Sequence, residues 1–183
     1  YLNNLILMAT NKTVFFLIGM LLIVLGISML APYSMQIVYD EGSHSFISSA
    51  FVTVFIGILC VLANLEKDFK LNLRQTFLFS TLAWIMVAIF GSLPFILATQ
   101  TYSFSDAFFE SMSGITTTGA TIINDLDNSP KSILLWRAIM QWLGGIGIVV
   151  MAITILPLLK VGGMQLFKME GPDSTEKILP RTI

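Results

Sequence analysis

A run of small and hydroxylated residues without charge lies at residues 114–121. It reads Gly-Ile-Thr-Thr-Thr-Gly-Ala-Thr. Threonine is a poor helix former and Gly119 can adopt backbone angles that other residues resist, so we expect extended backbone after the first residues of the run. Extended backbone at membrane depth is tolerated only where protein buries it or where it lines a polar cavity. A row of carbonyl oxygens lining a cavity is what a dehydrated potassium ion requires, because these oxygens replace its water.

The residues directly before this run predict a short helix at 104–116. Ser103 or Ser105 can cap it, Asp106 lies near the positive end of its dipole, and apolar or small residues recur at helical spacing: Phe104, Ala107, Phe108, Ser111, Met112 and Ile115. About twelve helical residues reach roughly 18 Å, about half a bilayer. We expect a re-entrant helix whose negative C-terminal end favours a cation at the membrane centre. The alternative is an amphipathic helix lying on the outer surface.

Acidic side chains surround the short helix. Asp106, Glu110, Asp125 and Asp127 would give an outer mouth a negative potential that concentrates cations, although each acid taken singly is typical of a solvated loop. Arg137 lies about a turn into the next apolar helix, where lipid exposure of an arginine is costly. We therefore expect Arg137 to pair with Glu110 or Asp127 and to brace the short helix.

Other chemistries find little support in the sequence. His44 stands alone without clustered metal ligands, and Cys60, the only cysteine, lies inside an apolar run. The spacing of serine, histidine and aspartate residues does not indicate a nucleophile with its general base. We therefore expect no enzyme and no bound cofactor. The net charge of −1 leaves no basic excess for nucleic acid.

Long apolar runs indicate an all-α membrane protein in a lipid bilayer. The chain is 55% hydrophobic and only 11% charged. Three uncharged runs, 13–31, 46–65 and 76–98, are long enough to cross the hydrocarbon core as helices, and a fourth crossing is expected within a helix at 133–159. The first two form an N-terminal hairpin within residues 1–66. Gly144, Gly145 and Gly147 in the fourth predict close packing against neighbouring helices.

The distribution of lysine and arginine predicts the topology. Eight of the ten basic residues fall in the N-terminal, second and last loops: Lys12, Lys67, Lys70, Arg74, Lys160, Lys168, Lys177 and Arg181. Only Lys131 and Arg137 fall near the other side. Because basic loops stay in the cytoplasm, both ends of the chain are expected there.

The stretch FSDAFFESMSGITTTGAT, followed by LLWRAIMQWLGGIGIVVMAITILPLLKVGGMQLFKMEGPDSTEKILPR, resembles the first pore repeat of the TrkH/TrkG-type potassium-uptake subunits of bacteria. These belong to the Trk, Ktr and HKT superfamily, in which four repeats of helix, pore helix, filter and helix surround one pore. The resemblance implies a first repeat at 67–160 and a cytoplasmic connector at 161–183 leading to further repeats. It also implies a bacterial inner-membrane location.

By the same resemblance, Thr117, Thr118, Gly119, Ala120 and Thr121 match the selectivity filter. Backbone carbonyls of Thr117, Thr118 and Gly119 would bind potassium, the substrate, and Gly119 matches the glycine associated with potassium preference over sodium. The family also implies a homodimer and a cytosolic nucleotide-binding regulatory subunit of the TrkA type.

Two rival hypotheses remain open at this stage. Four copies of a one-repeat chain could form a homotetrameric cation channel. Alternatively, the chain could be a non-conducting membrane scaffold or assembly subunit in which the threonine run is buried packing. We expect the sequence to be an N-terminal fragment of a longer protein, because it starts without methionine and stops in a polar stretch.

Overall fold

The computed structural model describes residues 12–65, 71–98 and 102–158, with side chains described as far as residue 153. The predicted connector at 161–183 lies outside the described residues. So do Lys67, Lys70, Lys160, Lys168, Lys177 and Arg181, on which most of the topology prediction rests.

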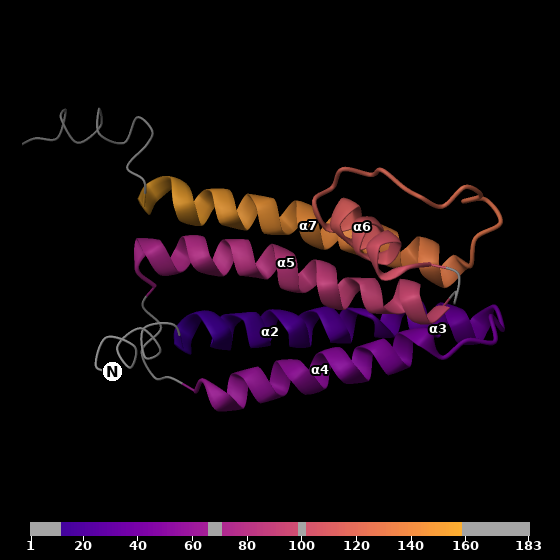
Figure 1. Cartoon of the computed structure of the whole chain (residues 1–183), viewed down its shortest axis with the longest axis horizontal. Helices are drawn as coiled ribbons and strands as arrows, with labels where there is room; N and C mark the ends of the chain where they lie inside the picture. The colour runs from indigo at the N-terminus through magenta and orange to yellow at the C-terminus, as the bar shows by residue number, and fades with distance from the viewer. Residues whose placement is uncertain (1–11, 66–70, 99–101, 159–183) are drawn as a thin grey trace, which may run out of the picture.

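Regular structure in the described ranges is entirely helical (Figure 1). The helices are α2 (Lys12–Ser28), α3 (Leu30–Val38), α4 (Ser45–Ala63), α5 (Leu73–Ala98), α6 (Phe104–Ile115) and α7 (Lys131–Leu158). Four stretches of the described chain are long and apolar enough to cross a membrane: Lys12–Val38, Ser45–Ala63, Leu73–Ala98 and Lys131–Ile153. The prediction of an all-helical membrane protein with four spans is confirmed.

The first span is longer than predicted. The apolar run ends at Ala31, yet α3 follows α2 after a single turn residue, Met29, and continues to Val38. Pro32 does not interrupt the helix here, because it lies in the first turn of α3, where a backbone N–H has no intrahelical partner. The helix therefore carries the chain well past Ala31 before it turns back.

Small residues let α2 and α4 pack closely as an antiparallel pair. A Cβ added to Gly19 would lie 2.8 Å from the carbonyl oxygen of Gly57, and one added to Gly57 would lie 2.9 Å from that of Gly19. Larger residues at either position would force the backbones apart. This contact is the small-residue packing expected between helices in a bilayer.

Trp136, near the start of α7, joins that helix to α4 and α5. Its side chain is fully buried, and its ring meets the ring of Phe46 edge to face with 6.0 Å between centroids. Its indole Nε1 donates a 3.0 Å hydrogen bond to the carbonyl oxygen of Gly91 in α5. Pro94 lies in the next turn of α5 and has no N–H to donate to the carbonyl of Phe90, the residue before Gly91.

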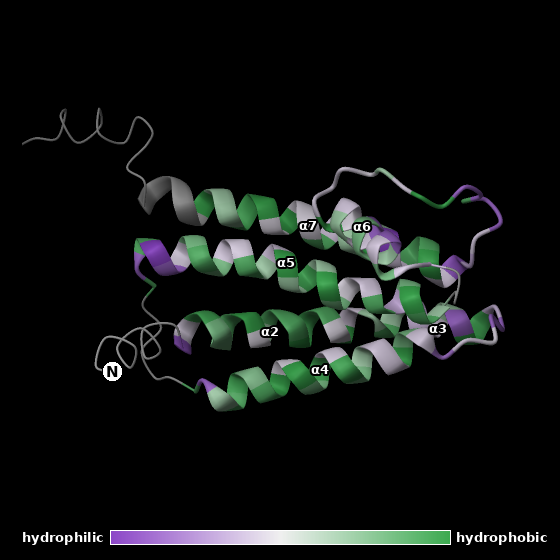
Figure 2. Cartoon of the chain, viewed as in Figure 1, coloured by the Kyte–Doolittle hydropathy of each residue, from purple (hydrophilic) through white to green (hydrophobic). Residues whose placement is uncertain are grey.

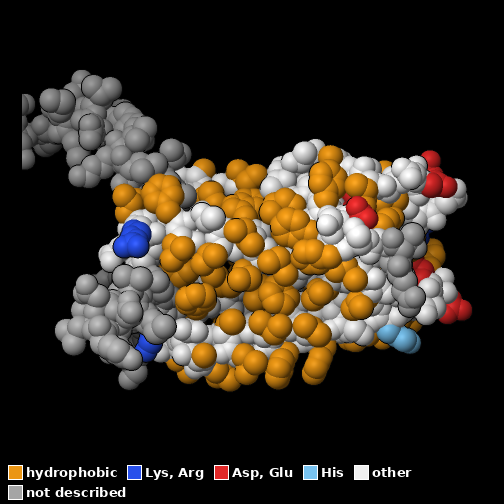
Figure 3. Space-filling view, in the orientation of Figure 1, with side chains coloured by type: hydrophobic (Ala, Val, Ile, Leu, Met, Phe, Trp, Pro, Cys, Tyr) orange, Lys and Arg blue, Asp and Glu red, His pale blue; other side chains and the backbone are white. Residues whose placement is uncertain are grey.

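Hydrophobic residues occupy the middle of the bundle and hydrophilic residues gather at its two ends (Figure 2). Figure 3 shows lysine and arginine at one end and acidic side chains at the other, with an apolar belt between them. Lys12 and Arg74 stand at the starts of α2 and α5, whereas Glu41 follows the end of α3, and Asp125 and Asp127 precede the start of α7, at the opposite side. Lys131 and Arg137 lie toward the acidic end.

Candidate functional site

The short helix α6 begins with a reciprocal cap. Ser103 Oγ accepts a hydrogen bond from the backbone N–H of Asp106 at 3.2 Å, and Asp106 Oδ2 accepts one from the backbone N–H of Ser103 at 3.1 Å. Of the two candidate caps, Ser103 is the one that acts. The Asp106 carboxylate therefore belongs to the helix start, where it also meets the positive end of the dipole.

The C-terminal end of α6 meets α7 half way along its length. A Cβ added to Gly144 would lie 1.8 Å from the carbonyl oxygen of Ile115, the last residue of α6. Gly144 is 13 residues after the start of α7 at Lys131, a rise of about 20 Å in an α-helix. The end of α6 thus lies deep along α7, far from the end of the bundle where α7 begins.

Gly145 and Gly147 meet no neighbouring helix among the described residues, so for them close packing stays a prediction. A Cβ added to either residue meets nothing within 4 Å in the part of the chain that the structure describes. Only Gly144 of the three makes the expected close approach, because it alone faces the end of α6.

The buried face of α6 is more polar than its sequence predicts. Ala107, Ser111 and Ile115 are buried, but Phe104 is 59% exposed and Phe108 and Met112 are half-buried. The buried set also includes Glu110, Ser113 and Gly114. The helix is rotated so that its polar side chains face the loop that follows and α7, which supply their partners.

The loop after α6 turns its N–H groups back toward the helix. The N–H of Thr117 donates to the carbonyl oxygen of Gly114 at 3.0 Å, and the N–H groups of Thr118 and Gly119 donate to that of Ser113 at 3.0 and 3.4 Å. All peptide bonds of the described residues are trans. Across a trans peptide the C=O and N–H are antiparallel, so the carbonyls of Thr116, Thr117 and Thr118 point away from the end of α6.

The prediction of extended backbone is wrong for two residues of this loop, which adopt left-handed conformations instead. Thr117 has a φ of 59° and Gly119 a φ of 78°. Glycine accepts such angles freely, but a β-branched threonine does so at a cost, of order 1–3 kcal/mol. The surrounding hydrogen bonds hold Thr117 there, which gives the loop a defined conformation although no helix or strand contains it.

The carbonyl of Ala120 is oriented the other way. It accepts a 2.6 Å hydrogen bond from Ser113 Oγ, so it faces α6. Ala120 belongs to the predicted ion-binding set, but its carbonyl is already engaged by the protein. The side chains and backbone of residues 117–121 are otherwise exposed in this chain.

Glu110 lies behind the loop and ties it to α7. The side chain is 2% exposed. Its Oε2 accepts hydrogen bonds from Thr121 Oγ1 at 3.0 Å and from the backbone N–H of Ile122 at 3.1 Å. Its Oε1 lies 2.5 Å from Nε of Arg137. Of the two acids considered as partners for Arg137, the structure places Glu110 in contact.

The remaining acids at this end stay on the surface. Asp125 accepts hydrogen bonds from the backbone N–H and the side-chain amide of Asn128, which closes a local turn. Asp127 is exposed. Neither contacts the loop at 117–121 through a hydrogen bond that involves its carboxylate.

The sequence did not reveal one contact at this end of the molecule. Glu41, in the loop after α3, accepts hydrogen bonds from the backbone N–H and the hydroxyl of Ser132 at the start of α7. The two residues are 91 positions apart, so no local spacing signals their contact.

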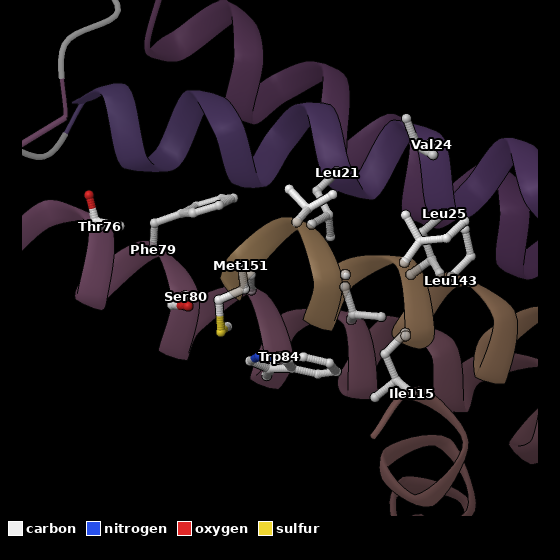
Figure 4. Close-up of a pocket in the computed structure, with 16 residues that line it drawn as sticks. Leu21, Val24, Leu25, Thr76, Phe79, Ser80, Trp84, Ile115, Leu143 and Met151 are labelled. Atoms are coloured by element: carbon white, nitrogen blue, oxygen red, sulfur yellow. The ribbon is translucent and has the colours of Figure 1, made fainter. Parts of the chain in front are cut away.

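A cavity of about 340 Å³ lies between α2, α5 and α7, with Ile115 at its edge (Figure 4). Its lining is almost wholly apolar, with Thr76 and Ser80 the polar exceptions. It offers a cation few oxygen ligands, so we do not assign the ion site to it. Among the described residues, no group of three or more His, Cys, Asp or Glu side chains could hold a metal ion.

Fold and site together define a multi-pass helical membrane protein with a half-length helix that leads into an exposed, carbonyl-presenting loop. The model of the TrkH cation transport protein family matches residues 42–182. The chain belongs to this family, and the resemblance read from the sequence is confirmed. The family is described by cation transport, not by an enzymatic reaction.

Curated relatives carry the same family name. The potassium uptake protein TrkH of Vibrio parahaemolyticus is 42% identical over 174 residues, which cover 93% of this chain and 36% of that protein. TrkH of Escherichia coli K12 is 40% identical over 169 residues, 90% of this chain and 35% of that protein. TrkG of the same strain is 34% identical over 167 residues, 89% of this chain and 34% of that protein.

A solved structure resembles the fold. The crystal structure of the potassium transporter TrkH from Vibrio parahaemolyticus matches with a TM-score of 0.78 at 42% identity, covering 83% of this chain and 33% of that one. The chain therefore spans about a third of the length of the relatives that it matches.

Proposed function

We propose that this chain forms the first pore repeat, with its preceding hairpin, of a potassium-uptake transporter. In this proposal α6 is a re-entrant pore helix, residues 117–121 form the selectivity filter, and α5 and α7 are the flanking helices of the repeat. The hairpin covers residues 1–66, the repeat residues 67–160 and the connector residues 161–183.

One observation carries the proposal: the N–H groups of Thr117, Thr118 and Gly119 all donate back to the end of α6. Carbonyls of the same peptides then face the opposite, open side, where they can replace water around a cation. Of the predicted ligands, this argument covers the carbonyls of Thr117 and Thr118, whereas that of Gly119 stays in the proposed set by the family resemblance alone. The carbonyl of Thr116 joins them, and that of Ala120 leaves because Ser113 Oγ holds it.

The depth of α6 supports re-entry over a surface helix. Ile115 meets Gly144 at the middle of α7, so a membrane-spanning α7 brings the end of α6 to the middle of the bilayer. There the negative end of the helix dipole favours a cation. A helix lying among the headgroups would meet only the first turns of α7.

Exposure of the loop supports a pore shared with other repeats. Residues 117–121 are exposed in this chain although their neighbours on α6 are buried. Threonines and carbonyls at membrane depth cannot face lipid, so further repeats must complete a polar cavity around them. The scaffold hypothesis is disfavoured for the same reason, because it requires the run to be packed within the chain.

The wider assembly follows the resemblance alone. We propose a homodimer in the bacterial inner membrane, with the described starts of α2 and α5 facing the cytoplasm and a TrkA-like nucleotide-binding subunit below. Lys12 and Arg74 stand at that end, as expected for a cytoplasmic face.

Uptake of rubidium or potassium by a bacterium deficient in its own potassium uptake tests the function. The whole protein, as its gene encodes it, is expected to restore saturable uptake that potassium inhibits far more strongly than sodium. Absence of uptake by protein present in the membrane would contradict conduction. Mass measurement in detergent distinguishes a homodimer from four one-repeat copies.

A further inference from the structure

The N-terminal hairpin reaches the pore repeat through a carboxylate at the start of α7. Glu41 Oε1 accepts a 3.1 Å hydrogen bond from the backbone N–H of Ser132, and Oε2 accepts one from the Ser132 hydroxyl. Ser132 has no exposed surface. The first N–H groups of a helix lack intrahelical partners and carry its positive dipole end, so an anion is stabilised there. Pro130, directly before α7, has no side-chain oxygen that could cap it.

The loop that carries Glu41 is itself held in one conformation. Asp40 and Gly42, on either side of Glu41, have φ of 48° and 64°, so the chain turns sharply around Glu41. The Glu41 N–H donates to the carbonyl oxygen of Gln36 at 3.1 Å, and Gln36 Nε2 donates to Ser45 Oγ at 2.9 Å. The carboxylate is thus presented to α7 from a fixed position between α3 and α4.

The first two turns of α7 bind both Glu41 and Glu110, the buried acid that holds residues 121 and 122. Ser132 and Arg137 are five residues apart on one helix, with the fully buried Trp136 between them. Arg137 pairs with Glu110, and Glu110 holds Thr121 and the N–H of Ile122. A continuous series of contacts therefore runs from the hairpin to the outer end of residues 117–121.

We propose that Glu41 is a positioning residue for the filter, and that the hairpin serves as a fixed support for the outer pore. Glu41 holds the start of α7, which sets the position of Arg137 and through it the Glu110 carboxylate. This inference rests on the proposed function of the filter. It assigns the hairpin a role in ion selectivity in addition to anchoring the chain in the membrane.

The test compares Glu41→Gln with Asp40→Asn in the whole protein. Both changes remove one negative charge at the same end of the molecule, but Asp40 is exposed and makes no hydrogen bond to α7 that involves its carboxylate. Asparagine also tolerates the positive φ at position 40. Rubidium uptake as a function of concentration, and the inhibition of uptake by potassium and by sodium, are measured for each variant.

We expect Glu41→Gln to raise the apparent KM for rubidium roughly three- to tenfold and to reduce the preference for potassium over sodium, as loss of a charge-assisted hydrogen bond implies. Asp40→Asn should stay within about twofold of the unmodified protein, because an exposed charge is screened by salt. Ser132→Ala should change KM in the same direction as Glu41→Gln. The double variant should be no worse than the more severe single one, because both changes break the same contact.

Three results would overturn the proposal. Equal KM changes in Glu41→Gln and Asp40→Asn would show that the change in KM comes only from the negative charge at this end of the molecule. A fall in the amount of protein with KM and ion preference unchanged would show that Glu41 contributes only to folding. Additive effects of Glu41→Gln and Ser132→Ala would separate the two residues. Failure of the unmodified protein to take up rubidium would instead contradict the proposed function.

Discussion

Nε of Arg137 lies 2.5 Å from Oε1 of Glu110, and the two side chains are only 13% and 2% exposed. The pair joins α6 to α7 directly behind the loop at 117–121. Removing both charges from water is costly, so the pair is not a free gain in stability. The pair instead fixes the geometry of the loop. With Arg137 as its countercharge, the Glu110 carboxylate accepts hydrogen bonds from Thr121 Oγ1 and the N–H of Ile122, which hold the outer end of the loop.

Arg137→Gln should destabilise the protein by about 3–5 kcal/mol, because it leaves the Glu110 carboxylate buried without its countercharge. Thermal unfolding in detergent and the amount of protein in the membrane measure this. The double variant Glu110→Gln with Arg137→Gln should recover part of the loss. Lys131→Gln, an exposed change on the same helix, is the control and should stay within about 0.5 kcal/mol. Equal stability of Arg137→Gln and Lys131→Gln would show that the pair does not brace α6.

Gly119→Ser should lower the preference for potassium over sodium. Nothing lies within 4 Å of a Cβ added there, so the effect is one of backbone, since a φ of 78° costs an L-residue about 1–2 kcal/mol. The loop would relax and its carbonyls would lose their spacing. Competition of rubidium uptake by potassium and sodium measures the change. An unaltered rate together with an unaltered preference would mean that these residues are not the filter.

Gly144→Ala should destabilise the repeat by about 1–3 kcal/mol, because its Cβ would lie 1.8 Å from the carbonyl oxygen of Ile115 and push α6 away from α7. Thermal unfolding and rubidium uptake should both decline. The matched control is Gly145→Ala, whose Cβ has nothing within 4 Å among the described residues and which gains helix propensity. If both variants behaved alike, the close approach of α6 to the middle of α7 would be wrong.

Ser113→Ala removes the hydroxyl that donates to the Ala120 carbonyl at 2.6 Å. The loss of one hydrogen bond should cost about 1 kcal/mol. Freed from Ser113, this carbonyl can turn outward, so the competition by sodium for rubidium uptake should increase. Ser105→Ala, an exposed change on the same helix, should leave ion preference unchanged. Identical ion preference in both variants would show that the orientation of the Ala120 carbonyl has no influence on selectivity.

Local signals predicted much of the site. Spacing alone limited the cap of α6 to Ser103 or Ser105 and placed Asp106 in its first turn, because capping acts over a few neighbouring residues. The structure selects Ser103 and adds the reciprocal bond from its N–H to Asp106. The burial of Glu110 was not recognisable in this way. An apolar stripe through Phe104 and Phe108 suggested a different buried face, and the rotation of α6 depends on Arg137 being available 27 residues later.

The backbone of the loop at 117–121 was also predicted only in part from the sequence. The threonine and glycine content of the run predicted extended backbone, because these residues resist helical geometry. Residues 117–121 do lie outside any helix, but Thr117 and Gly119 are left-handed and not extended. The content of the run did not predict which carbonyls face outward. That depends on Ser113, whose backbone carbonyl accepts two N–H groups and whose hydroxyl holds Ala120.

By itself, the sequence determined the class of the protein, its four spans and the position of the half-length helix, because apolar run length, capping and backbone propensity act over a few neighbouring residues. Only the tertiary structure decided that Glu41 caps α7, that Glu110 faces Arg137 and that α6 ends against Gly144. These contacts join residues 27 to 91 positions apart. Their formation depends on how the packed helices bring distant charges and small residues into register.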